Sequence, residues 1–411
     1  MAAGASTELA RGPLTGMRVL EMGSTVAGPF CGRLLADFGA EVIKIEPAQG
    51  DAVRTMGKHF GGKSLYAASI FRNKRLVSID LHRAEGRDIA RSIALTCDVV
   101  VENFKPGTLE GWGLGWGDLS HANPRLVMVR ISGYGQDGPY ASRPGYGVIC
   151  EAVSGLRHLT GDPDRPPSRV AVSMTDYITG LHAAFGAVMA LMARGATGRG
   201  QCIDAALYEC AFNFMEPWIP AYEKLGHVAN RTGSRLAEST PNNLYPTGDG
   251  EFIHITAMAD GLFRRLAKAM DRPDLAEDER FARALERNRN SSALDAIIAD
   301  WTVSQPLARI ETKLEAAGVP ATRIYTIADI FKDPHFAARG AIAAAPDEDL
   351  GPVTMAAVVP RLSATPGGIR HAGHAVGQDT RAVLAEVLGY GSDDIAMLER
   401  AGVIACAGPA S

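Results

Sequence analysis

The sequence predicts an α/β protein whose central element is a parallel sheet. Its first 130 residues alternate short apolar runs, rich in β-branched residues, with stretches long enough for helices. Strands that are apolar along their whole length are buried on both faces, which is typical of a parallel sheet covered by helices. The expected strands are MRVLEMG (17–23), AEVIKIE (40–46), RLVSIDL (75–81), DVVVENF (98–104) and RLVMVRIS (125–132).

Helices are expected between these strands. Segment 28–39 has Pro29 in a position suited to the first helical turn and Gly39 at the expected end, and 84–97 is a second helix. Strands that alternate with helices in this way predict a Rossmann-like large domain. The loop GYGQDGPYASRPGYG (133–147) follows the last of these strands, at the sheet edge where ligands of such domains bind.

The rest of the chain predicts a second, smaller domain. Two apolar helices are expected at about 177–194 and 205–217, still within the large domain. The pattern then changes to a polar linker, and a strand (251–257) followed by charged helices indicates an α+β domain. We therefore expect a large domain over 14–220, a linker over 221–245, a small domain over 246–336, and a linker and return to the large domain over 337–411.

Composition excludes several classes of function. With 46% hydrophobic residues, 21% charged residues and a net charge of −4, the chain has no field that would attract nucleic acid or a membrane surface. The six cysteines form no CxxC pair, no secretory signal is recognised, and the apolar helix around 181–193 looks too short to span a bilayer. A cytoplasmic protein is expected.

Common cofactor and metal motifs are missing. The first βαβ unit lacks G-x-G-x-x-G, so a nicotinamide site is weakly supported, although another nucleotide remains open. The ten histidines form no HxxxH or HExxH, so no metal site is expected. No G-x-S-x-G is present either.

Asp176 is a single acid between two apolar segments in VAVSMTDYITGLHAAFG (170–186). A carboxylate there could cap the following helix. It could also act as a nucleophile toward an activated acyl group, since a helix N-terminus stabilises the anion. The two roles can coexist, and the residues alone leave both open.

The chain resembles the class III CoA-transferases, the family of formyl-CoA transferase and carnitine CoA-transferase, which also contains the α-methylacyl-CoA racemases. It looks most like the succinyl-CoA-dependent dicarboxylate members. The blocks that carry the resemblance run in order from about Leu14 to Ile404. They are VAGPFCGRLLADFGAEVIKIE, NKRLVSIDL, VVVENFKPGTLEGWGL, NPRLVMVRISGYGQDGPY, SMTDYITGLHAAFGAVMAL and TGRGQCIDAALYE.

The resemblance implies an interlocked homodimer that moves CoA from an acyl-CoA donor to a small carboxylic acid. It implies that Asp176 attacks the donor, forming an aspartyl anhydride and then an aspartyl-CoA thioester. CoA is a substrate, and no permanently bound cofactor or metal is implied. The implied CoA-site residues are Val26, Ala27, Ile79, Asp80, Leu81, His82, Asn103, Phe104, Lys105 and Tyr134. Pro47 and Gly111-Trp112 depart from the pattern, because relatives carry arginines there.

Three other functions remain as alternatives. Racemase members have a histidine where this chain has Tyr146, and a phenol is too weak an acid to shuttle protons near neutral pH, so transfer is favoured over racemisation. The unrelated alternatives are a nucleotide-dependent oxidoreductase and a nucleotide-sensing scaffold. If the substrate is a dicarboxylate, its second carboxylate needs a partner. The candidates are Arg143, Arg169, His158, Asn242 and Asn243.

Overall fold

The computed structural model describes residues 12–407, which form two compact units. Of these residues, the larger unit contains 12–156, 170–220 and 337–407. The smaller unit contains 157–169 and 221–336. The sequence-based division kept 157–169 in the large domain. Instead this segment groups with the smaller unit, since Arg231 donates hydrogen bonds to the backbone oxygens of His158 and Asp162.

A seven-stranded sheet forms the centre of the larger unit, in the order β14-β5-β2-β1-β6-β7-β8. Every neighbouring pair is parallel except β14 and β5. The strand order reverses between β1 and β6, which is where open sheets of this kind bind ligands. The strands are β1 (Arg18–Glu21), β2 (Glu41–Glu46), β5 (Lys74–Ile79), β6 (Val99–Glu102), β7 (Val127–Ser132), β8 (Cys202–Ala206) and β14 (Ile404–Ala405).

Five of these strands are the runs that the sequence predicted. The sequence predicts no strand for β8: no element is expected over 202–204, and 205–206 are expected to begin the helix at 205–217. The run is short and passes directly into α9 (Leu207–Phe212), so its period is hard to recognise. It pairs in parallel with β7 and forms an edge of the sheet.

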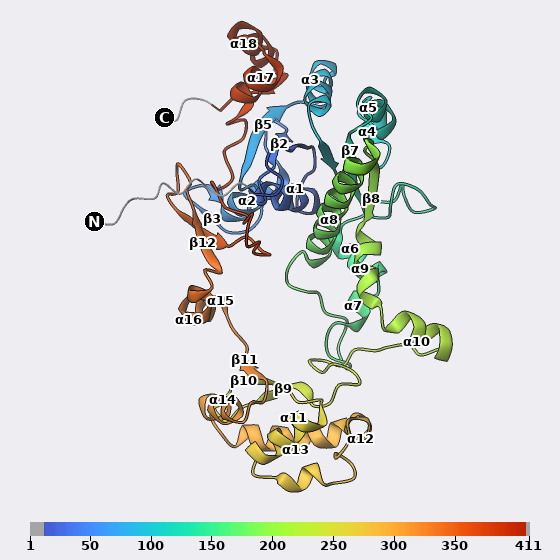
Figure 1. Ribbon diagram of the computed structural model, residues 1–411, viewed down its shortest axis with the longest axis vertical. Helices are drawn as coiled ribbons and strands as arrows, with labels where there is room; N and C mark the ends of the chain where they lie inside the picture. Colours follow the sequence, from blue (N-terminus) through green and yellow to red (C-terminus); the bar gives the residue numbers. More distant parts are fainter. Residues whose placement is uncertain (1–11, 408–411) are drawn as a thin grey trace, which may run out of the picture. The chain divides into compact units, whose positions relative to one another are not determined.

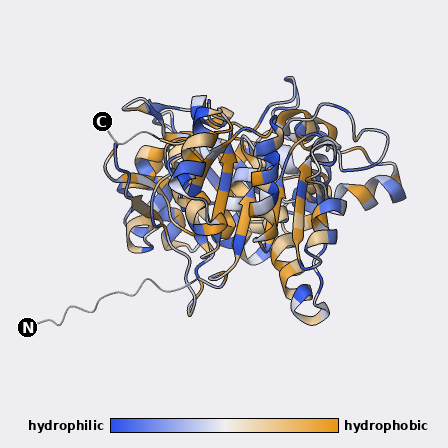
Figure 2. Ribbon diagram, turned by 90° about the horizontal axis from the view of Figure 1, so that it is seen from above, coloured by the Kyte–Doolittle hydropathy of each residue, from blue (hydrophilic) through white to orange (hydrophobic). Residues whose placement is uncertain are grey.

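Helices cover both faces of the sheet (Figure 1). One face packs against α1 (Ala27–Asp37) and α8 (Met174–Thr197), through small residues such as Ala183 and Ala187. The other packs against α3 (Ala84–Leu95), α5 (Trp116–Ala122) and α17 (Thr380–Leu388). Figure 2 shows hydrophobic colouring along central strands and hydrophilic colouring on outer helices and loops, as expected for strands buried on both faces.

The α8 helix is longer than the sequence analysis expected, at 24 residues. By length and composition it is apolar enough to cross a membrane, so the expectation that it was too short was wrong. It packs along α1 and β7, as a core helix of a globular domain does. Gly180 permits close packing there, because a Cβ at this position would lie 2.8 Å from the backbone oxygen of Ala27.

Shorter elements complete the larger unit and the connections to the smaller one. They are η1 (Ala52–Thr55), β3 (His59–Phe60), β4 (Lys63–Ser64), α2 (Leu65–Ile70), α4 (Thr108–Gly111), α6 (Gly147–Val153), α7 (Leu156–Leu159), η2 (Asn213–Met215), α10 (Trp218–Leu225), β12 (Ile342–Ala345), β13 (Val353–Ala356) and α18 (Ser392–Arg400).

The smaller unit has a three-stranded antiparallel sheet in the order β11-β10-β9. Phe263, Leu266, Ile298 and Ile310 form part of the core between this sheet and its helices. The elements are β9 (Asn242–Pro246), β10 (Phe252–Thr256), α11 (Asp260–Ala269), η3 (Pro273–Ala276), α12 (Ala284–Arg289), α13 (Ser291–Val303), α14 (Leu307–Ala316), β11 (Ala321–Arg323), α15 (Ile327–Lys332) and α16 (Pro334–Ala338).

Candidate active site

The turns that follow β1 and β6 meet where the strand order reverses. Asn103, just beyond β6, accepts a hydrogen bond from the Ser24 backbone N–H at 2.7 Å. Its side-chain amide donates to the Ser24 carbonyl oxygen at 2.8 Å. Because both turns leave the carboxyl ends of adjacent parallel strands, the sequence-predicted residues Val26, Ala27 and Asn103 come together at one edge.

The α8 helix brings Asp176 to this edge. The helix begins at Met174 after an exposed loop, so the apolar residues 170–172 that precede it are neither buried nor part of a strand. Ser173 occupies the N-cap position and Asp176 lies in the first turn, so Asp176 is not the capping residue. A first-turn carboxylate is still stabilised by the positive end of the helix dipole.

Aromatic contacts fix the start of α8. The hydroxyl groups of Tyr66 and Tyr177 are 2.8 Å apart, and the Tyr177 ring meets the Phe30 ring edge-on at 4.8 Å. Burial raises the pKa of the Tyr66 phenol well above its usual range, with further contributions from the hydrogen bond to Tyr177 and the charge of Asp176. Tyr66 therefore stays protonated and keeps its hydrogen-bonding role.

A hollow of about 470 Å³ joins these elements. Six of the sequence-predicted residues line it, Asp176 among them, and Phe104 also reaches a second hollow. Its lining consists of Ser24, Thr25, Val26, Ala27, Asn103, Phe104, Lys105, Pro106, Ile131, Ser132, Gly133, Ala141, Arg143, Pro144, Gly145, Tyr146, Gly147, Asp176 and Leu207. Lys105 and Arg143 in this hollow could bind an anionic acyl compound, and the carboxylate of Asp176 could attack it.

The second hollow, of about 210 Å³, lies beside the first and shares Ser24 and Phe104 with it. It contains the other predicted group, Ile79 to His82, and also Pro47 and Trp112, two positions expected from the sequence to depart from the family pattern. The Trp112 ring packs edge-on against Phe104 at 5.4 Å and His82 at 5.7 Å. Aromatic and apolar walls of this kind suit a planar base better than a phosphate group.

Other predicted residues lie elsewhere. Tyr134 packs between Tyr140 and Tyr208 and lines neither hollow. Of the candidate partners for a second carboxylate, only Arg143 lines the hollow with Asp176. The remaining candidates belong to the smaller unit; they are His158, Arg169, Asn242 and Asn243.

Arg143 is placed by a stacking contact. Its guanidinium lies 3.6 Å from the centre of the Tyr140 ring, and its backbone N–H donates to the Tyr140 carbonyl oxygen at 2.8 Å. Within residues 12–407, no carboxylate forms an ion pair with Arg143. Its side chain is exposed, so its charge is available to a ligand.

Cys150 is the other nucleophilic side chain near Asp176. Burial, followed by the charge of Asp176, raises the pKa of its thiol to about 11. A thiol is nucleophilic only as the thiolate, so Cys150 is inert near neutral pH. Asp176 is therefore the better candidate for covalent chemistry at this edge.

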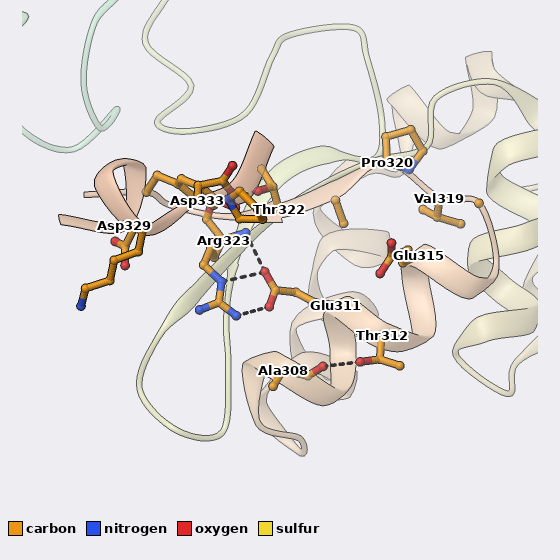
Figure 3. Close-up of a pocket in the computed structure, with 15 residues that line it drawn as sticks. Ala308, Glu311, Thr312, Glu315, Val319, Pro320, Thr322, Arg323, Asp329 and Asp333 are labelled. Carbon is orange, nitrogen blue, oxygen red and sulfur yellow. Dashed lines mark hydrogen bonds and ion pairs between the residues drawn. The ribbon is translucent and has the colours of Figure 1, made fainter. Parts of the chain in front are cut away.

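A larger hollow, of about 890 Å³, lies in the smaller unit (Figure 3). The carboxylate of Glu311 is there paired with the Arg323 guanidinium, whose Nε donates at 2.9 Å. A carboxylate neutralised in this way is a poor nucleophile. None of the sequence-predicted site residues lines this hollow.

Comparison with known proteins identifies the family. A family model described as CoA-transferase family III matches residues 14–380. The chain belongs to this family. It is 47% identical over 394 residues to succinyl-CoA–D-citramalate CoA-transferase from Chloroflexus aurantiacus, covering 95% of this chain and 98% of that protein. It is 33% identical over 395 residues to human succinyl-CoA:glutarate CoA-transferase, covering 95% of this chain and 90% of that protein.

Solved structures agree with this assignment. A CaiB/BaiF family protein from Brucella suis superposes with a TM-score of 0.82 at 34% identity, covering 92% of this chain and all of that chain. The family resemblance inferred from the motifs is thus confirmed, and the protein is an enzyme of the CoA-transferase type.

Several residues that line the two hollows were not predicted from the sequence. Ser24, Thr25 and Gly147 line the hollow with Asp176, and Asp51 lines the adjacent one. Ser24 and Thr25 directly precede Val26, so their place in the same turn could have been inferred. The signals for Gly147 and Asp51 are weaker, because single glycines and acids in loops are usually structural.

Proposed function

We propose that the protein transfers CoA from succinyl-CoA to a small dicarboxylic acid, with Asp176 as the nucleophile. The observation that carries the proposal is the presence of Asp176, Lys105 and Arg143 in one hollow at the reversal point of the sheet. The relatives named above are transferases that use succinyl-CoA, with D-citramalate and glutarate as the second substrate in their names. Both acids carry a second carboxylate.

The chemistry balances without an additional reactant. A carboxylate oxygen of Asp176 attacks the thioester carbonyl, the carbon–sulfur bond breaks, and CoA leaves as the thiolate while a mixed anhydride forms. The thiolate then attacks the aspartyl carbonyl, which releases succinate and leaves an aspartyl-CoA thioester. The acceptor carboxylate then attacks the aspartyl-CoA thioester, which releases the CoA thiolate and forms a second mixed anhydride. The thiolate attacks the acceptor's carbonyl in this anhydride, so the acceptor becomes the CoA thioester and Asp176 is regenerated as the carboxylate.

The two adjacent hollows support a binding mode for CoA. The smaller hollow, with Trp112, His82 and Pro47, suits the adenine end because its walls are aromatic and apolar. The chain of CoA then passes Ser24 and Phe104, which line both hollows, and its thioester reaches Asp176 in the larger one. Lys105 is exposed at this boundary and could meet a phosphate or carboxylate.

Arg143 is the proposed partner of the second carboxylate. It lines the hollow with Asp176, and it carries a charge without an acidic partner in the part of the chain that the structure describes. A guanidinium binds a carboxylate through two parallel hydrogen bonds, and stacking on Tyr140 restricts its rotamers before binding.

A homodimer is part of the proposal. Apolar side chains on one face of α8 are exposed, at the helical spacing of Leu181, Phe185 and Met192. Exposed apolar stripes of this kind support packing against a second copy. A cytoplasmic location stays a prediction from the sequence.

The test is a panel of acceptors with succinyl-CoA as donor, read by mass spectrometry of the CoA thioesters. Citramalate, malate, itaconate and glutarate should form thioesters, whereas carnitine and phenyl-substituted acids should react at least about 10-fold more slowly. Preference for a monocarboxylate would contradict the dicarboxylate proposal. The oxidoreductase alternative is tested by thermal unfolding, since CoA should raise the midpoint and NAD(P)H should not.

A further inference from the structure

The turn between β1 and α1 is held by side chains from three other segments. Lys44, in β2, donates from Nζ to the Gly23 carbonyl oxygen at 2.5 Å. Asn103 binds both polar backbone groups of Ser24. Asp51 accepts a hydrogen bond from the Thr25 N–H at 3.0 Å. Gly23, Ser24 and Thr25 each line at least one of the two hollows, and each is therefore held by a side chain from another segment.

Thr25 needs this support because its backbone is left-handed, with φ of 67°. A β-branched residue rarely adopts this conformation, since its side chain crowds the adjacent peptide groups. Such a conformation persists only where the surroundings determine it. Asp51 is the side chain that binds the Thr25 N–H, and Thr25 lines the hollow that contains Asp176.

Asp51 is itself held within a buried ionic chain. Its carboxylate lies 2.9 Å from Lys44 Nζ and accepts the Val53 N–H at 3.0 Å. Lys44 also approaches Glu21 at 3.2 Å, and Glu21 accepts from Lys74 at 2.6 Å. The two positive charges of the lysines balance the two negative charges of Asp51 and Glu21, and all four side chains are almost completely buried.

Stability alone does not require this arrangement. Burying ions removes their hydration, and apolar replacements of similar volume often leave a protein equally stable. The series of ion pairs ends at Lys74, whose Nζ also donates a hydrogen bond to the Pro29 carbonyl oxygen in the first turn of α1 at 2.7 Å. The ionic chain thus runs from the Thr25 turn to the α1 turn, and α1 packs against α8 beside Gly180.

We propose that Asp51 is a positioning residue for acyl transfer: it holds Thr25 in the left-handed conformation and so fixes the Ser24–Ala27 wall relative to Asp176. Lys44 holds the Asp51 carboxylate in place for this role. The inference rests on the CoA transfer proposed above. A purely structural role would predict loss of stability without a selective loss of turnover.

The experiment compares Asp51→Asn and Asp51→Glu with Asp37→Asn. Asp37 is a matched control, because it is equally buried, pairs with Arg72 and lies at the far end of α1. The measurements are kcat, KM for succinyl-CoA, release of succinate in a single turnover, and the midpoint of thermal unfolding. Asp51→Glu keeps the charge and the pair with Lys44, and should fold even if Asp51→Asn does not.

Both Asp51 variants should lower kcat and single-turnover succinate release about 10- to 100-fold, with a smaller change in KM. Asp37→Asn should lower the unfolding midpoint but keep kcat within about twofold of wild type. Adding Thr25→Gly to Asp51→Asn should recover about fivefold or more of kcat, since glycine adopts positive φ without crowding. Unchanged kcat in the Asp51 variants, or no recovery with Thr25→Gly, would overturn the positioning role.

Hydrogen–deuterium exchange separates this inference from the proposed function. If wild type releases no succinate from succinyl-CoA and forms no acceptor-CoA thioester, the proposed function fails. The positioning role then predicts faster exchange of the peptide containing 23–27 in Asp51→Asn than in Asp37→Asn. Equal exchange in the two variants would overturn it.

Discussion

Gly147 and Asp176 share a space that holds only one side chain. A Cβ on Gly147 would lie 2.0 Å from Oδ2 of Asp176 and 2.8 Å from its Cγ. Gly147 is the first residue of α6, and its φ lies outside the left-handed region. Glycine is therefore required here for space and not for backbone conformation, and the vacant volume is occupied by the proposed nucleophile.

Gly147→Ala should displace the carboxylate while leaving the backbone intact. A shift of about 1 Å in a reacting group costs on the order of 100-fold in rate, so kcat should fall by about that factor. The measurement is succinyl-CoA-dependent transfer, together with the unfolding midpoint. Gly117→Ala is the matched control, because that helical glycine has open space where a Cβ would be added, and it should transfer at the wild-type rate. Wild-type transfer by Gly147→Ala would mean that the carboxylate acts from another position.

Asp176→Asn should abolish transfer and covalent modification while the protein stays folded. A first-turn acid contributes only about 0.3–1 kcal/mol to helix stability, so a large change in the unfolding midpoint is not expected. The measurement is peptide mass spectrometry after incubation with succinyl-CoA and hydroxylamine, which should convert the Asp176 side chain. Asp118, an exposed acid in the first turn of α5, provides the control Asp118→Asn. Full activity in Asp176→Asn excludes the covalent mechanism.

Arg143→Met should reduce selectivity for dicarboxylic acids. Loss of a charge-assisted hydrogen bond costs about 1.5–3 kcal/mol, which corresponds to a fall of about 10- to 100-fold in kcat/KM for dicarboxylate acceptors. A monocarboxylate acceptor such as butyrate should be much less affected. Arg125→Met removes another exposed arginine, outside the hollow, and should change neither value. Equal losses for both acceptor classes would remove Arg143 from substrate recognition.

Racemase activity should be absent. Tyr146 lines the hollow at the position where racemases carry a proton-transferring histidine. A phenol transfers protons slowly near neutral pH, so 2-methylacyl-CoA in deuterated water should gain no deuterium at its α-carbon, as followed by NMR. The same mixture without enzyme gives the background. Rapid incorporation would place the racemase alternative ahead of CoA transfer.

Sequence patterns predicted the parallel sheet because its strands are buried on both faces and read as continuous apolar runs, such as VVVE in β6. They failed for β8, a short edge strand that Asp204 interrupts and whose first half is only partly buried. Helix ends were also uncertain, since α8 begins at Met174 without a side-chain cap that would mark the position.

Some of the candidate site residues could also be predicted from the sequence, and others could not. Val26, Asn103 and Asp176 were implied by the family resemblance, and the meeting of the turns that contain Val26 and Asn103 follows from the rule that parallel strands end at one edge. Asp51 and Gly147 could not be predicted in this way, because their roles depend on contacts with residues far away in the sequence. Thr25 and Asp51 are 26 positions apart, and nothing local in either segment indicates the left-handed turn.

Asp51 should make the stability of the larger unit depend on acid. Burial alone would raise the pKa of Asp51. The charge of Lys44 and the hydrogen bonds from the N–H groups of Val53 and Thr25 together lower this pKa by more than burial raises it, so it lies below its usual range. A carboxyl whose pKa is lower in the folded protein contributes stability that is fully present above the unfolded pKa of about 3.9 and is lost as pH falls through the folded pKa. The difference in unfolding midpoint between wild type and Asp51→Asn should therefore be constant from about pH 5 to 7 and shrink below about pH 4. Asp88→Asn, at an exposed position on α3, should give a small difference at every pH. A difference for Asp51→Asn that stays the same down to pH 3 would show that Lys44 does not hold the Asp51 carboxylate in its charged form.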